Sequence, residues 1–166
     1  MPAQAAPRAA REDRGVDSPR IRPAVAEDLP ALLDLYRQLA GGRPESEPAG
    51  PADAGPILAR ILADPARQLL VADAGGRVVG TAEVLVNANL THGGQPWAIV
   101  ENVVVAADAR RLGAGRALMA HVVAQAREAG CYKIQLLSRA ERADAHLFYE
   151  SLGFTRSAVG FRRYLP

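Results

Sequence analysis

An apolar strand-like run, a basic glycine-containing loop and a helical segment follow one another over residues 103–129, and this order constrains the fold most strongly. The apolar run covers residues 103–105, the loop covers 110–115, and apolar residues then recur at helical spacing from 117 to 129. A β-rich run follows at residues 131–137. Two strands joined by a crossover helix pair in parallel, with a right-handed connection. The sequence therefore predicts a βαβ unit.

The loop between this strand and this helix has the character of an anion-binding site. A helix start leaves several backbone N–H groups unpaired, with a partial positive charge behind them. A dinucleotide fingerprint would need a third glycine where Leu118 stands, and the Gly-Lys-Ser/Thr ending of a nucleoside-triphosphate loop is absent. What remains is Arg/Gln-x-x-Gly-x-Gly/Ala, matched by Arg110, Gly113 and Gly115. A plain turn that caps a helix has a similar sequence, and this alternative stays open.

A second phrase lies further along the chain, at Phe148-Tyr149-Glu150-Ser151-Leu152-Gly153-Phe154. With the loop, and in this order and spacing, it resembles the GNAT superfamily of N-acetyltransferases from Trp97 to Phe154. Arg142 departs from the family pattern, because members often carry asparagine there. The resemblance implies an α/β fold with a mixed central β-sheet of six or seven strands flanked by about four helices. It also implies acetyl-CoA as the cosubstrate.

The remaining segments fit one domain. Residues 1–20 are poor in large apolar groups and predict a disordered tail, which leaves residues 21–166 as a single N-acetyltransferase domain. Strands are predicted at 21–24, 68–72, 78–86, 97–105 and 131–137, with one or two more at 155–158 and 161–165. Helices are predicted from residue 29 to 39 and from 57 to 62, separated by a loop at 41–55.

The composition excludes several classes of function. Twenty basic and 18 acidic residues nearly balance, and no basic cluster is interleaved with aromatic residues, so we expect no nucleic-acid partner. The single cysteine, Cys131, excludes an internal disulfide and is most simply a small buried hydrophobe. No membrane span or signal-peptide core is found, which predicts a cytoplasmic protein. We expect no metal ion to be required. The sequence leaves open whether the protein forms a homodimer.

The resemblance assigns cofactor contacts to two stretches. The strand end would pair with the amides of pantetheine, and the loop would bind the diphosphate of coenzyme A. These predicted cofactor-binding residues are Val103, Val104, Val105, Arg110, Arg111, Leu112, Gly113, Ala114, Gly115 and Arg116.

Glu101 is the predicted general base. It interrupts an otherwise apolar strand, where a carboxylate needs water, a partner or a chemical role. The resemblance places a carboxylate at this strand position in many members, where it acts directly or through a water. Acetyl transfer to an amine needs such a base, because only about one alkylammonium in a thousand is deprotonated at pH 7. A salt bridge or a solvated carboxylate is the structural alternative.

Tyr149 is the predicted general acid, since the family tyrosine in this phrase commonly sits beside the coenzyme sulfur. A packed aromatic residue is its structural alternative. His146, three positions earlier, would tune the acid or touch the substrate, or be an ordinary core or solvated histidine. Asn89 and Trp97 bracket the turn before the catalytic strand and are candidates for the acceptor pocket, with turn and core roles as the alternative.

The predicted function is acetyl-CoA-dependent N-acetylation of a small primary amine by direct attack in a ternary complex. An acetyltransferase acting on a protein N-terminus or lysine is one alternative. A non-catalytic acyl-CoA-binding sensor or scaffold is another, and a nucleotide-binding interaction domain is a third.

Overall fold

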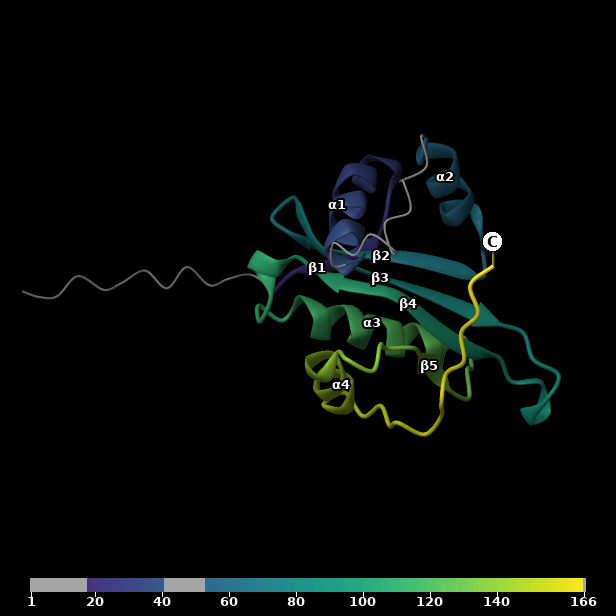
Figure 1. Cartoon of the computed structure of the whole chain (residues 1–166). Helices are drawn as coiled ribbons and strands as arrows, with labels where there is room; N and C mark the ends of the chain where they lie inside the picture. Colours follow the sequence, from purple (N-terminus) through teal and green to yellow (C-terminus); the bar gives the residue numbers. More distant parts are fainter. Residues whose placement is uncertain (1–17, 41–52, 166) are drawn as a thin grey trace, which may run out of the picture.

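The computed structural model describes residues 18–40 and 53–165, which form an α/β domain around one sheet (Figure 1). The strand order is β1-β2-β3-β4-β5, with antiparallel pairing from β1 to β4 and parallel pairing of β4 with β5. The strands are β1 (Arg20–Pro23), β2 (Arg67–Ala74), β3 (Arg77–Asn87), β4 (Trp97–Val105) and β5 (Ile134–Leu136). The α-helices are α1 (Leu29–Ala40), α2 (Gly55–Ala63), α3 (Ala114–Glu128) and α4 (Ala143–Glu150).

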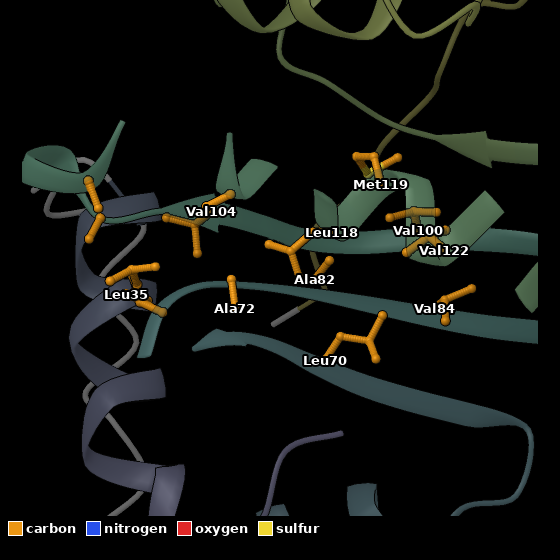
Figure 2. Close-up of a cluster of buried hydrophobic side chains, with 14 of the residues drawn as sticks. Leu35, Leu70, Ala72, Ala82, Val84, Val100, Val104, Leu118, Met119 and Val122 are labelled. Carbon is orange, nitrogen blue, oxygen red and sulfur yellow. The ribbon is translucent and has the colours of Figure 1, made fainter. Parts of the chain in front are cut away.

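Helices cover both faces of the sheet. In Figure 1, α1 and α2 lie on one side of the strands, and α3 and α4 lie on the other. The main core forms where α3 packs on the central strands: Leu118, Met119 and Val122 of the helix meet Val84 and Val100 of the sheet (Figure 2). These helical residues recur at the spacing of one helix face, which is why the segment forms an amphipathic helix against the sheet.

The predicted βαβ unit is confirmed. β4 has the predicted bounds, α3 follows it, and β5 returns parallel to β4 with Ala98 opposite Ile134 and Val100 opposite Leu136. The strands predicted at 68–72 and 78–86 are present as β2 and β3, which pair antiparallel, and the first two predicted helices are also present.

The prediction of six or seven strands is wrong for the described part of the chain, which has five. Residues 155–158 and 161–165 form no strand, and only Ile134–Leu136 of the predicted run 131–137 is extended and paired. Aromatic and aliphatic residues favour strands, but a strand also needs a partner and a surface to pack on. Here Phe161 and Tyr164 are 93% and 82% exposed, so neither packs on the sheet.

Two predictions fall largely outside the described residues. Of the predicted tail at 1–20 the structure describes only residues 18–20, and of the predicted loop at 41–55 it describes only residues 53–55. Within the ranges that the structure describes, no helix combines the length and the apolar character needed to cross a bilayer.

The core assignment predicts the cost of removing a side chain. Leu118 is fully buried, so Leu118→Ala leaves a cavity between α3 and the sheet and should lower the free energy of unfolding by about 2–5 kcal/mol. The matched control is Leu90→Ala, because Leu90 is fully exposed and should change stability by less than about 0.5 kcal/mol. Urea denaturation measures both. Equal effects of the two substitutions would contradict the packing.

Candidate active site

The site lies where β4 and β5 separate. The two strands pair over only three positions, ending at Val100 and Leu136, although β4 continues to Val105. A cavity of about 200 Å³ opens beside the point of separation, and side chains from α1, α4 and the C-terminal segment reach it as well. Its lining residues are Leu39, Val100, Glu101, Asn102, Val103, Leu136, Leu137, Ser138, Arg139, Arg142, Tyr149 and Arg162.

A β-bulge in β4 marks the start of this separation. Thr81 of β3 is opposite Val104 and Glu83 is opposite Glu101, so one residue of β3 faces two of β4. Asn102 occupies the bulge with a φ of 54°, a left-handed conformation that asparagine tolerates better than most residues. A bulge bends its strand and increases the local twist. It therefore turns the second half of β4 away from the line of β5.

Glu83 holds the bulge in place and was missed in the sequence analysis. Its side chain is buried, and its carboxylate accepts hydrogen bonds from Asn102 Nδ2 at 3.0 Å and Arg67 Nη1 at 2.6 Å. The contact with Asn102 ties the bulge residue to the neighbouring strand. The signal was the same as for Glu101: a carboxylate inside an apolar strand.

Glu101 reaches the cavity with a free carboxylate. In the described part of the chain, no cation forms an ion pair with it and no group donates a hydrogen bond to it. Burial raises the pKa of the Glu101 carboxyl, and the negative charge of Glu83 across the strand pair raises it further, while Arg162 lowers it. A carboxylate whose pKa is raised is a stronger proton acceptor than an exposed one.

Tyr149 reaches the same cavity from α4. Its ring is half-buried between Phe148, at 5.3 Å between ring centroids, and Phe154, at 6.0 Å. Burial raises the pKa of the Tyr149 hydroxyl, the positive charge of Arg142 lowers it, and Glu101 raises it. The hydroxyl is therefore protonated at neutral pH and able to donate a proton. The structure thus brings Glu101 and Tyr149, 48 positions apart in the sequence, to one cavity.

The loop before α3 has the free amides that an anion site needs. Among the described residues, no acceptor takes a hydrogen bond from the backbone N–H groups of residues 110–116. Gly113 caps the helix with a φ of 86°, and Arg111 also has a positive φ, of 66°. Successive turns of this kind direct several N–H groups toward one point, beside the positive end of the helix dipole. The loop can therefore bind a phosphate or diphosphate.

Close packing joins this loop to the rest of the site. A Cβ atom at Gly115 would lie 3.3 Å from Phe148 Cζ and 3.5 Å from Val105 Cγ2. The first turn of α3 thus sits against both the end of β4 and α4. Arg116 Nη2 donates to Ser151 Oγ at 3.4 Å and points toward the end of α4.

The three predicted substrate-binding residues do not line the cavity. The side chain of Asn89 organises its own turn by donating to the carbonyl oxygens of Thr91 and Gln95. Trp97 lies beneath the ammonium of Lys133, 5.3 Å from the ring centroid. His146 Nε2 is 2.8 Å from the carbonyl oxygen of Arg139, so its ring holds the loop before α4.

Besides Asn102, four polar or charged cavity residues were not selected as site residues from the sequence: Ser138, Arg139, Arg142 and Arg162. Three lie in or beside the segment between β5 and α4, and the fourth lies in the C-terminal segment. No local spacing relates Arg162 to Glu101, since only the folded chain brings the two together.

Comparison with known proteins gives a consistent family. The sequence matches the family described as Acetyltransferase (GNAT) family over residues 29–154. Glucosamine 6-phosphate N-acetyltransferase of Trypanosoma brucei brucei is 38% identical over 79 residues, or 48% of this chain and 52% of the relative. Aminoglycoside N(6')-acetyltransferase type 1 of Stenotrophomonas maltophilia is 32% identical over 84% of this chain and 92% of the relative. The chain therefore spans about half the length of the first relative and nearly all of the second.

Solved structures have the same fold. A structure from Agrobacterium tumefaciens str. C58, to which an acetyltransferase activity is attributed, superimposes with a TM-score of 0.80 at 38% identity. The superposition covers 88% of this chain and 99% of that one.

The charges around Glu101 give a test of the site. Glu83→Gln should lower the pKa of Glu101, because the negative charge across the strand pair is removed, and Arg162→Ala should raise it, because a positive charge is lost. Titration of the side-chain carboxyl by carbon NMR measures both shifts. Asp108→Asn is the control, since that exposed carboxylate pairs with Arg77 and should leave Glu101 unchanged. Shifts of the same sign in the first two variants would refute this arrangement.

Proposed function

The chain belongs to the acetyltransferase (GNAT) family, and on that premise we propose that it transfers the acetyl group of acetyl-CoA to a small primary amine by direct attack in a ternary complex. One observation carries this proposal: Glu101 and Tyr149, the base and acid that the chemistry needs, line a single cavity at the separation of β4 and β5.

Glu101 would act as the base that removes a proton from the amine, which is the most costly requirement of the reaction. A primary amine enters as its ammonium form, and the deficit of neutral amine at pH 7 is worth roughly 4 kcal/mol. A positioned carboxylate reduces this deficit by accepting the proton that the ammonium loses before its nitrogen attacks. Its raised pKa brings it closer to that of the amine, which favours the transfer.

The proposed step balances in atoms and charge. The ammonium form of the amine first loses one proton to Glu101, directly or through a water, and Glu101 passes it to solvent. The neutral amine nitrogen then attacks the thioester carbonyl carbon, forming the C–N bond, and its second proton passes to Glu101. The C–S bond then breaks and Tyr149 donates its proton to the leaving sulfur. Tyr149 regains a proton from solvent as Glu101 loses one. The products are the acetamide and the free thiol of coenzyme A.

Acetyl-CoA would bind along the free edge of β4, with its diphosphate at the loop before α3. The free amides of residues 110–116 would bind the diphosphate, and the edge of β4 beyond Val100, which β5 leaves unpaired, would pair with pantetheine amides. Backbone N–H groups at this edge would also polarise the thioester oxygen. The acetyl group would then lie near Glu101 and Tyr149.

A small amine is supported as the acceptor by the size of the cavity and by the relatives. Of the two relatives described above, one is named for an amino sugar phosphate and the other for aminoglycosides. A cavity of about 200 Å³ suits a small molecule or the tip of a chain better than a folded surface.

A panel of amines with acetyl-CoA and thiol detection tests the proposal. Release of the thiol that depends on both the amine and the enzyme supports it. The alternative of a non-catalytic acyl-CoA sensor predicts binding of acetyl-CoA, seen by calorimetry, without turnover of any amine. A nucleotide-binding interaction domain predicts that ATP or NAD binds as tightly as coenzyme A.

Removing either proposed catalytic group should separate their roles. Glu101→Gln should lower kcat at pH 7 by about 10²–10⁴-fold and recover partly at higher pH, where more of the amine is already neutral. Tyr149→Phe should lower kcat while the Kd for acetyl-CoA changes little. Rate–pH profiles and calorimetry measure these effects. A loss in Glu101→Gln that is the same at every pH would point to a structural role.

The loop assignment predicts a selective loss of cosubstrate affinity. Gly113→Ala places a side chain on a residue with a φ of 86°, which costs about 1–2 kcal/mol in that conformation and should raise the Kd for coenzyme A. The matched control is Gly76→Ala in the β2–β3 turn, where φ is 90° and a Cβ atom also meets nothing within 4 Å. The control should lower the melting temperature similarly but leave the Kd unchanged. Equal Kd values in both variants would remove the loop from the binding site.

A further inference from the structure

Three arginine residues converge on the cavity that holds Glu101 and Tyr149. Arg139 and Arg142 come from the segment between β5 and α4, and Arg162 comes from the C-terminal segment. Two of them lie near the reacting groups, since the positive charge of Arg162 lowers the pKa of Glu101 and that of Arg142 lowers the pKa of Tyr149.

None of the three guanidinium groups is neutralised by the described part of the protein. The ion pairs found there use other residues, and the contact of Arg162 is a hydrogen bond of 3.4 Å from Nη1 to Tyr164 Oη. Glu101 is the single acidic residue among those that line the cavity. Like charges gathered in one concave surface repel each other and attract anions. The cavity therefore favours the binding of a negatively charged group.

A hydroxyl group on the same wall is also without a partner. Ser138 Oγ is buried from solvent and makes no hydrogen bond with any described residue. A buried hydroxyl left unpaired is costly, so it points to a polar atom that binds there. An anionic oxygen in the cavity would accept a hydrogen bond from it.

The phosphates of coenzyme A do not account for these arginine residues. The free amides at residues 110–116 follow the end of β4, and Glu101 lies four residues before that end, a span of up to about 13 Å along the strand. The cavity is lined by residues 100–103 of β4 and by none from the loop. The three positive charges thus lie at the reaction end of the site.

We propose that the acceptor is a primary amine that also carries an anionic group, a phosphate, phosphonate or carboxylate, and that Arg162, Arg142 and Arg139 bind that group. This assignment rests on the acetyltransferase function proposed above and specifies its substrate class. The guanidinium group binds such oxyanions through paired N–H donors, and Ser138 adds a hydroxyl donor. With the anion held by the arginine residues, the amine is directed toward Glu101.

Substrates that share an aminoethyl group test this assignment. The acceptors are O-phosphoethanolamine, β-alanine and ethanolamine, and the quantity measured is the ratio of kcat/KM for each anionic amine to that for ethanolamine. The wild type should prefer one or both anionic amines over ethanolamine, and the larger ratio shows whether the site favours a phosphate or a carboxylate. Arg162→Ala should lower this preference by about 10- to 100-fold, and Arg162→Lys should restore part of it. The ratio cancels any change in the basicity of Glu101 that is the same for both acceptors.

Arg163→Ala is the matched control, because its exposed side chain is next in sequence but does not line the cavity. It should leave the preference unchanged. The assignment is overturned if ethanolamine is the preferred acceptor, if Arg162→Ala and Arg163→Ala have equal effects, or if Arg162→Ala raises the KM for acetyl-CoA and leaves the preference intact.

Calorimetry separates this assignment from the acetyltransferase function itself. If no amine turns over, O-phosphoethanolamine and β-alanine are titrated into the protein saturated with coenzyme A. Binding that Arg162→Ala abolishes and Arg163→Ala preserves would support the anion site while the proposed reaction fails. Absence of binding together with absence of turnover would overturn both.

Discussion

The separation of β4 from β5 is the constraint on which the rest of the site depends. The two strands share three paired positions, after which β4 continues beside β3 alone. A central strand normally has both edges occupied, so the free edge of β4 leaves backbone groups available to a ligand. The gap also lets side chains from opposite layers meet: Leu39 comes from α1, and Tyr149 comes from α4. A continuous sheet would keep these two layers apart.

Glu83 stabilises the bulge at which the two strands separate. A buried carboxylate is costly unless its oxygens are paired, and both oxygens of Glu83 have donors, Arg67 on one and Asn102 on the other. The bulge and the buried charge therefore support each other, since loss of the bulge would leave the carboxylate without its amide partner. The same charge raises the pKa of Glu101 on the next strand. One side chain thus contributes to both the geometry and the electrostatics of the site.

Local patterns predicted the parts of the fold that local physics determines. The bounds of β4, the crossover helix α3 and the parallel return of β5 follow from periodicity and chain connectivity. The strands predicted after residue 154 failed because strand formation depends on a partner that residue preferences do not reveal, and Phe161 lies exposed instead. At the site, Glu101 was noticed because it interrupts an apolar run, whereas Glu83 gives the same signal and was overlooked. Arg162 carries no local signal, since its relation to Glu101 arises only from the folding of the C-terminal segment.

The arrangement of charges has a consequence for the timing of the reaction. Burial and Glu83 raise the pKa of Glu101, and Arg162 opposes them. An anionic acceptor bound to Arg162, as proposed, would neutralise the opposing charge and raise the basicity of Glu101 further. The increase would occur only when the acceptor is in place, which is when the amine must lose its proton. In an empty site the positive charge of Arg162 favours the carboxylate form of Glu101. Substrate binding and base strength are then coupled through a single guanidinium group, and a neutral amine of the same length would lack that coupling.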